Sequence, residues 1–221
     1  MTFVNRLIRL TGIALTLILL CLKGAAQERK ITYGILLDNT GSMRSQFRQV
    51  IELGKAVVHQ VHGHGTVSLF DFHSQGKGSS IAKPFLRIEA SADEQLLNRA
   101  IEGFYVEGGQ TALLDAIGLI AQTLDKNESD EKVIILITDG EDRTRGDQKK
   151  LIKQLGEHKI SVFAIGLVQE LDDQNGLIRP SPRARAIDLL KSITKETGGR
   201  VVFPKSERTE MEKLLAELAL P

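Results

Sequence analysis

A continuous apolar run near the middle of the chain constrains the fold most strongly. Residues Lys132–Thr138 read KVIILIT, and every residue from Val133 to Ile137 is apolar. A strand with one face in water alternates apolar and polar residues, whereas a strand buried on both faces does not. This segment is therefore predicted to be a central strand whose sheet has helices packed against both faces.

Similar apolar runs and amphipathic stretches alternate along the rest of the chain. The predicted strands are Ile31–Asp38, Thr66–Phe72, Ile81–Ile88, Lys132–Thr138, Ile160–Val168 and Arg200–Phe203. The predicted helices are Gln46–His62, a helix opened by a Ser91–Glu94 capping box, Thr111–Lys126, Asp147–His158, Arg183–Glu196 and a last helix near Thr209–Leu220. This order predicts an α/β fold of the doubly wound kind, with a mostly parallel central sheet. Pro84 places one strand at a sheet edge, where we expect an antiparallel strand.

The first 26 residues have the layout of a secretory signal peptide. Arg6 and Arg9 precede an apolar run, Leu10–Leu22, and the small residues Gly24-Ala25-Ala26 follow it. The run is about 13 residues long, shorter than the ~20 residues that a bilayer span needs. We expect cleavage after Ala26 and export to the periplasm or the extracellular space, with an uncleaved anchor as the alternative.

Residues 27–221 are then expected to form one domain without a membrane span. The whole chain has 29 lysines and arginines against 28 acidic residues, and a nucleic-acid-binding protein would show a clear basic excess. Its single cysteine, Cys21, lies in the predicted leader, so the exported domain has no disulfide and depends on core packing for its stability.

Oxygen-bearing side chains follow two of the predicted strands and precede one helix. The first strand ends in Asp38, Thr40 and Ser42, the central strand ends at Asp139, and Thr111 follows two glycines. In doubly wound sheets, ligands bind beyond the carboxyl ends of the strands, where the winding direction switches. Mg²⁺ prefers such oxygen ligands, and Mn²⁺ can take its place. The sequence therefore predicts a metal site at Asp38, Thr40, Ser42, Thr111 and Asp139.

These motifs resemble the metal-ion-dependent adhesion site of von Willebrand factor type A (vWA) domains. DNTGS at 38–42, GGQT at 108–111 and ILITDG at 135–140 follow the family's order of D-x-S-x-S, a distant threonine and a distant aspartate. Thr40 departs from the pattern, because the family has serine there, but it keeps the hydroxyl. The resemblance extends from Ile31 to the last helix and is to bacterial exported members of the family.

The resemblance implies protein binding without catalysis. Members of the family grip an acidic residue of a partner protein through the metal ion, and some couple binding to a shift of the last helix. The chain is therefore expected to be a metal-dependent adhesion module rather than an enzyme.

Other interpretations remain open from the sequence. Asp38 could be a helix cap, and Thr111 could cap the helix that it begins. An Mg²⁺-dependent phosphohydrolase of the haloacid-dehalogenase type also carries an aspartate after its first strand, but it needs a second carboxylate at the position of Thr40. A structural subunit with a vestigial metal site is a third possibility.

Two further groups of polar residues are expected to have no site of their own. His59, His62 and His64 lie near one helix end. They could bind a transition metal, but we expect them to be solvated residues whose positive charge complements the helix dipole. Glu141 and Asp142 are expected to be solvated loop acids that add negative potential near the cation.

Overall fold

The computed structural model describes residues 30–74, 81–144, 146–174, 176, 180–205 and 211–221. The predicted signal peptide lies outside these residues, as does the predicted start of the last helix at Thr209. Within the described part, no helix is long and apolar enough to cross a membrane.

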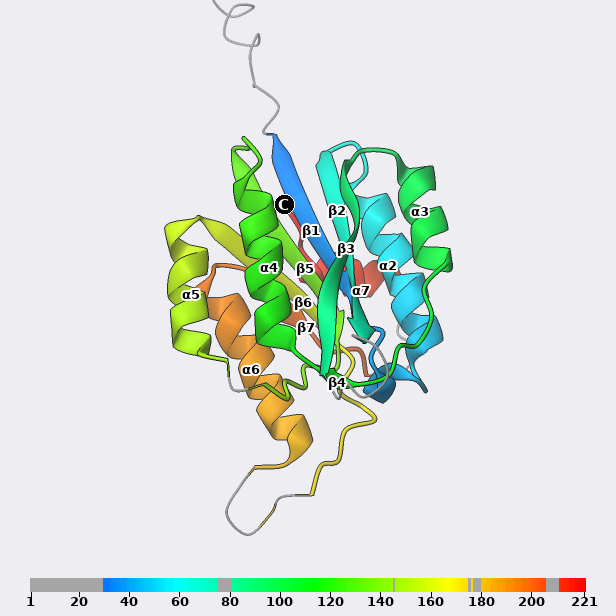
Figure 1. The fold of residues 1–221 in the computed structure, drawn as a ribbon, viewed down its shortest axis with the longest axis vertical. Coiled ribbons are helices and arrows are strands. Elements are labelled where there is room, and N and C mark those ends of the chain that lie inside the picture. Colours follow the sequence, from blue (N-terminus) through cyan, green and yellow to red (C-terminus); the bar gives the residue numbers. More distant parts are fainter. Residues whose placement is uncertain (1–29, 75–80, 145, 175, 177–179, 206–210) are drawn as a thin grey trace, which may run out of the picture.

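The described chain is an α/β fold built around one sheet (Figure 1). Its strands are β1 (Ile31–Leu37), β2 (Gly65–Ser74), β3 (Ile81–Ser91), β4 (Gln110–Thr111), β5 (Glu131–Thr138), β6 (Ile160–Gly166) and β7 (Val201–Val202). Its helices are the short 3₁₀ helix η1 (Gly41–Met43), α2 (Phe47–Val61), α3 (Glu94–Glu102), α4 (Leu113–Asp125), α5 (Gln148–Glu157), α6 (Pro182–Glu196) and α7 (Met211–Leu218).

The sheet is mostly parallel and winds in two directions from β1. Its order is β4-β3-β2-β1-β5-β6-β7, and among these neighbours the β2–β3 pair is antiparallel. The chain passes from β1 to β2 and β3 on one side, and it later returns to β5 on the other side of β1. The predicted doubly wound fold is confirmed, with its switch point between β1 and β5.

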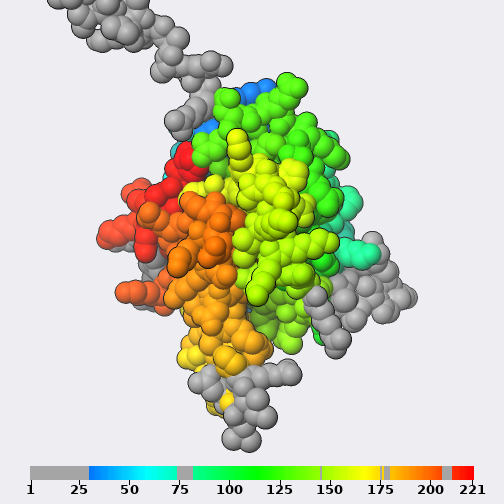
Figure 2. All heavy atoms as spheres, turned by 90° about the vertical axis from the view of Figure 1, so that its left-hand side faces the viewer, coloured from blue at the N-terminus to red at the C-terminus, as the bar shows by residue number. Residues whose placement is uncertain are grey.

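The central run lies in the sheet as the sequence predicted. Val133, Ile135 and Ile137 pack into one core with residues of α2, α3 and α7. Ile134 and Leu136 pack into the opposite core with residues of α4, α5 and α6. All five side chains are fully buried, and burying each stabilises the fold by roughly 1.5–3 kcal/mol. Figure 2 shows α5 and α6 lying side by side over the second of these faces.

The β3 strand runs antiparallel to its neighbour β2, as expected. It is not the outermost strand along its whole length, because β4 pairs with its first residues on the other side. Ile81 and Ala82 pair with the two residues of β4, and from Lys83 onward β3 has no described strand on its outer side. Pro84 therefore lies at an open edge, where its missing N–H breaks no ladder.

The start of α3 differs from its prediction. Asp93, not Ser91, is the N-cap of α3, because its carboxylate accepts the N–H of Leu96 at 3.0 Å. Ser91 is the last residue of β3 and accepts the N–H of Asp93 instead. The sheet extended three residues beyond the predicted strand end at Ile88, and this removed Ser91 from the cap position.

Both ends of the described domain lie at the edge of the sheet formed by the amino ends of its parallel strands. Lys30 directly precedes β1 at this edge. The Tyr33 hydroxyl in β1 donates to the backbone oxygen of Pro221 at 2.7 Å, which fixes the other end of the chain there (Figure 1).

Candidate metal centre

The carboxyl ends of β1 and β5 lie side by side at the switch point. The two strands pair along their lengths as far as Leu37 and Ile137, and the N–H of Asp38 donates to the carbonyl of Ile137 at 2.9 Å. Beyond this point the chain turns to opposite faces, because α2 follows β1 and α5 follows β5. Asp38 and Asp139 therefore leave the sheet next to each other.

Two hydroxyl groups donate to the carboxylate of Asp38, and two more lie beside one of them. Its Oδ1 accepts hydrogen bonds from the hydroxyl and the backbone N–H of Thr40, at 2.7 and 3.1 Å. The Thr40 hydroxyl also lies 2.8 Å from that of Thr111 and 3.3 Å from that of Ser42. The Thr138 hydroxyl donates to Oδ2 of Asp38 at 2.6 Å. Loops that are far apart in the sequence thus place their oxygen atoms together.

Asp139 brings a second carboxylate, and one of its oxygens has no partner among the described residues. Its Oδ1 accepts the backbone N–H of Glu141 at 2.8 Å, and the hydroxyl of Ser42 also stabilises the ionised form. Its Oδ2 is buried and accepts no hydrogen bond from the part of the chain that the structure describes. A buried carboxylate oxygen without a donor is costly, and a cation is one group that could satisfy it.

Burial makes the pair of carboxylates electrostatically unfavourable. The side chains of Asp38 and Asp139 are almost fully buried, and no described lysine, arginine or histidine forms a salt bridge with either. Burial and then the charge of Asp139 raise the pKa of Asp38 to about 7, against hydrogen bonds from Thr138 and Thr40. Burial also raises the pKa of Asp139. Two carboxylates and three hydroxyls form a donor set that fits a hard divalent cation.

All five predicted ligands lie in this cluster. Asp38, Thr40, Thr111 and Asp139 are buried, and Ser42 is exposed on its outer side. The structure brings their side chains together, and their binding of a metal ion stays a prediction.

The start of α4 corrects two expectations about this region. Thr111 belongs to β4 and does not cap α4, which begins at Leu113 after Ala112. The carboxylate of Asp142 instead accepts the N–H of Leu114 at 3.1 Å, across 28 residues of sequence. Glu141 is not simply solvated either, because it forms an ion pair with Arg143 at 2.8 Å.

Asn39 holds the loops of the cluster together, a role that the sequence did not reveal. Its side chain accepts the N–H of Phe72 at 2.8 Å and donates to the carbonyl of Tyr105 at 3.1 Å. Its own carbonyl accepts the N–H of Glu107 at 2.7 Å. These partners lie far away along the chain, so no local pattern could have indicated them.

His59 contacts Glu94 at 2.9 Å in the last turn of α2. His73 contacts Asp71 at 3.2 Å near the carboxyl end of β2, next to Phe72, whose N–H donates to Asn39. Among the described residues, no group of three or more histidine, cysteine or acidic side chains is arranged to hold a metal ion.

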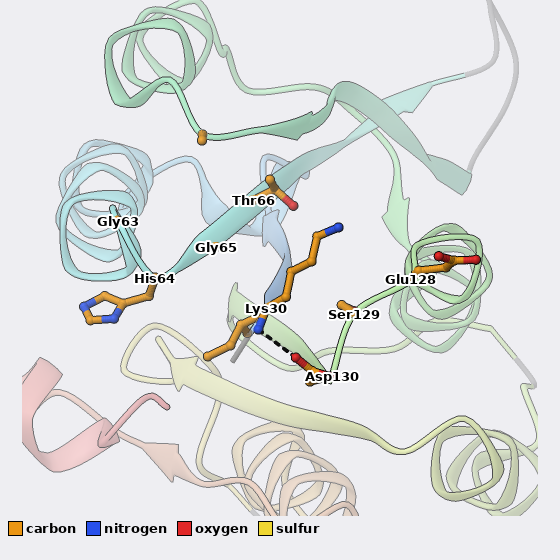
Figure 3. Close-up of a pocket in the computed structure, with 10 residues that line it drawn as sticks. Lys30, Gly63, His64, Gly65, Thr66, Glu128, Ser129 and Asp130 are labelled. Carbon is orange, nitrogen blue, oxygen red and sulfur yellow. Dashed lines mark hydrogen bonds between the residues drawn. The ribbon is translucent and has the colours of Figure 1, made fainter. Parts of the chain in front are cut away.

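A pocket of about 1070 Å³ lies at the opposite edge of the sheet, where the strands begin (Figure 3). The backbone N–H of Lys30 donates to Asp130 at 3.0 Å across it. The side chains of His64 and Glu128 lie on opposite sides and point in different directions. Its polar groups therefore do not converge on a common point, as those around Asp38 do.

Comparisons with solved structures show the same fold in bacterial proteins. An aerotolerance-related membrane protein from Bacteroides fragilis is 19% identical, with a TM-score of 0.62 over 85% of this chain and 98% of that one. BatB from Bacteroides thetaiotaomicron is also 19% identical, with a TM-score of 0.63 over 86% and 97%. The pilus adhesin SpaC from Lactobacillus rhamnosus GG is 14% identical, with a TM-score of 0.60 over 87% of this chain and 30% of that one.

Sequence comparison identifies the family. A search of curated proteins finds no match. The family profile of the von Willebrand factor type A domain matches residues 34–217, which include the candidate cluster and nearly the whole fold. The chain belongs to the von Willebrand factor type A domain family.

Proposed function

We propose that this chain is a non-catalytic protein-binding module that depends on a divalent cation. Asp38, Thr40, Ser42, Thr111 and Asp139 hold Mg²⁺, or Mn²⁺ in its place. The observation that carries the proposal is the pair of buried carboxylates that, among the described residues, have no salt-bridge partner, and one of which keeps an oxygen that accepts no hydrogen bond from them.

The donor set suits a metal ion that binds a further ligand. Three of its five side chains are neutral hydroxyls, so the ion keeps much of its positive charge. Mg²⁺ usually retains several water molecules in protein sites, and one of these can be exchanged for an outside oxygen. An acidic residue of a partner protein supplies such an oxygen together with a negative charge. Ser42, the exposed member of the cluster, marks the side from which the partner approaches.

An exported or surface location is part of the proposal. The apolar leader supports it, and relatives in fold include proteins described as a membrane protein and a pilus adhesin. An acidic partner on a cell surface or in the periplasm is consistent with both.

The phosphohydrolase alternative has no support from the site. That chemistry needs a carboxylate two residues after the first aspartate to move protons. The residue there is Thr40, whose hydroxyl donates to Asp38. The family match also points to a vWA domain.

Isothermal titration calorimetry with MgCl₂ and MnCl₂ tests the metal site. The exported domain is expected to bind one divalent ion, and Asp38→Asn and Asp139→Asn should each abolish binding while the circular dichroism spectrum is unchanged. Asp188→Asn, which alters an exposed carboxylate on α6, is the matched control and should bind as the wild type does. No uptake by the wild type at millimolar Mg²⁺ or Mn²⁺ would refute the proposal.

A further inference from the structure

The loop after β5 crosses the start of α4 and is bonded to it at two places. The backbone N–H of Arg143 donates to the carbonyl of Thr111 at 2.9 Å. One residue earlier in the loop, the carboxylate of Asp142 accepts the N–H of Leu114 at 3.1 Å. The segment that carries Thr111 is therefore tied to the loop that begins with Asp139.

The helix α4 has no capping side chain of its own, and Asp142 takes that role from another loop. The N-cap residue of α4 is Ala112, whose side chain cannot accept a hydrogen bond. The N–H groups in the first turn of a helix have no acceptor within the helix, and a side-chain oxygen usually accepts one of them. A negative charge at this place also interacts favourably with the helix dipole. The placement of the first turn of α4, and of Thr111 just before it, therefore depends on Asp142.

The carboxylate of Asp142 is itself held in one orientation. The backbone N–H of Thr144 donates to its Oδ2 at 3.1 Å, and the Thr144 hydroxyl lies 3.0 and 2.9 Å from its two oxygens. Gly146 of the same loop lies against Leu114, because a Cβ at Gly146 would come within 2.9 Å of that side chain. The loop is thus both hydrogen-bonded to the start of α4 and closely packed against it.

The same loop is fixed to the cluster at its other end. Oδ1 of Asp139 accepts the N–H of Glu141 at 2.8 Å. Asp142 follows Asp139 by only three residues. A short, hydrogen-bonded stretch of chain therefore determines how far Thr111 lies from Asp139.

Thr111 needs this support more than the two aspartates of the cluster do. Asp38 and Asp139 directly follow β1 and β5, which pair along their lengths. Thr111 belongs to a strand of two residues, and Gly108 and Gly109 precede that strand. Glycine places little restriction on the backbone, so the contacts on the carboxyl side of Thr111 contribute most to its position.

We propose that Asp142 is a positioning residue of the metal site. It acts through the start of α4 and not by binding the ion, because its hydrogen bond to Leu114 keeps the Thr111 hydroxyl beside those of Thr40 and Ser42. The inference rests on the proposed function, since Thr111 is one of the residues proposed to hold Mg²⁺. Removing a group that orients a metal ligand typically weakens metal binding by about tenfold or more, which is a measurable effect.

Isothermal titration calorimetry with MgCl₂ tests this role on Asp142→Ala, Asp142→Asn and Asp93→Ala. Asparagine keeps an oxygen that can accept the N–H of Leu114, and it loses the charge. Asp93→Ala is the matched control, because Asp93 caps α3 through the N–H of Leu96 at 3.0 Å. Asp93 follows Ala92, which lines the pocket at the opposite edge of the sheet. Thermal denaturation in EDTA measures the loss of each cap separately from metal binding.

Asp142→Ala is expected to bind Mg²⁺ about tenfold more weakly than the wild type, and Asp142→Asn should stay within about threefold of it. Both alanine variants should have a lower thermal midpoint in EDTA, because each loses a helix cap. Asp93→Ala should nevertheless keep the wild-type affinity. If Asp142→Ala does not fold, Thr144→Val takes its place, because it removes the hydroxyl that orients the carboxylate, and its Mg²⁺ affinity should also fall.

Wild-type affinity in Asp142→Ala, or in Thr144→Val where that variant is needed, would overturn the inference and leave the proposed function standing. An equal loss in Asp93→Ala would also overturn it, because metal affinity would then follow stability alone. An equal loss in Asp142→Asn would do the same, because the charge and not the hydrogen bond would then matter. No Mg²⁺ binding by the wild type would overturn the proposed function and the inference with it.

Discussion

Replacing Asp38 by asparagine should stabilise the metal-free protein at neutral and alkaline pH. The substitution keeps the size of the side chain and one acceptor oxygen, and it removes one of the two buried negative charges. Burial and Asp139 raise the pKa of Asp38 to about 7 in the folded protein. In the unfolded chain an aspartate has a pKa of about 3.9.

The size of the effect follows from these two pKa values. Each unit between them corresponds to about 1.4 kcal/mol, so the ionised carboxylate costs the folded state on the order of 4 kcal/mol above pH 7. Between about pH 4 and pH 7 the folded state binds more protons than the unfolded state. The free energy of unfolding of the metal-free wild type should therefore fall as pH rises through this window.

Urea denaturation in EDTA between pH 5 and pH 8.5 measures this effect. The free energy of unfolding of Asp38→Asn minus that of the wild type should grow with pH and level off above about pH 7. Loss of the hydrogen bonds from Thr138 and Thr40 to a full carboxylate opposes the gain, so about 2–4 kcal/mol is expected at pH 8. Asp188→Asn should show no such growth.

Adding Mg²⁺ should reverse the order of stability. A concentration one hundred times the dissociation constant stabilises the wild type by about 2.7 kcal/mol and leaves Asp38→Asn unchanged. The reasoning fails if metal-free Asp38→Asn is less stable than the wild type at pH 8, or if Mg²⁺ stabilises both proteins equally.

Three further substitutions test other parts of the structure. Thr111→Val keeps the shape of the side chain and removes its hydroxyl, so Mg²⁺ affinity measured by calorimetry should fall at least about tenfold with the thermal midpoint in EDTA little changed; an unaltered affinity would remove Thr111 from the ligand set. Gly34→Ala would place a methyl group against Ile120 of α4, and urea denaturation should show a loss of about 1–3 kcal/mol; no loss would mean that α4 yields to the methyl group. Arg87→Ala should cost about 3 kcal/mol, because it leaves the buried Asp71 carboxylate without its main partner, and adding Asp71→Asn should recover part of the loss; a purely additive double variant would contradict this pairing.

The sequence predicted the parts of the fold that depend on local patterns. The run from Val133 to Ile137 is apolar at every position because helices cover both of its faces, and this is visible without knowing which helices they are. The two-residue strand β4 was not predicted, since it exists only through its pairing with the start of β3. A strand of that length has no periodicity to detect.

In the candidate site too, residues that belong to local sequence patterns were predicted, whereas contacts between residues far apart in the sequence were not. Asp38, Thr40 and Ser42 follow the first predicted strand, and the switch-point rule predicted that Asp139 would lie beside them. The supporting contacts of Asn39 and of Asp142 depend on residues 28 to 68 positions away. Only the folded chain brings these groups together, so composition and spacing could not reveal them.

The positions of Lys30 and Pro221 have a practical consequence for experiments and for assembly. Lys30 and Pro221 leave the fold at one edge, and the cluster around Asp38 lies about 23 Å away, at the far end of the seven-residue strand β1. A linker to a bead, a sensor chip or a neighbouring domain can therefore be joined next to Lys30 or to Pro221, or at both, without shielding the end that carries Asp38 and Asp139. In a larger polypeptide whose neighbouring segments attach at Lys30 and Pro221, the end of the domain that carries Asp38 would point away from those segments.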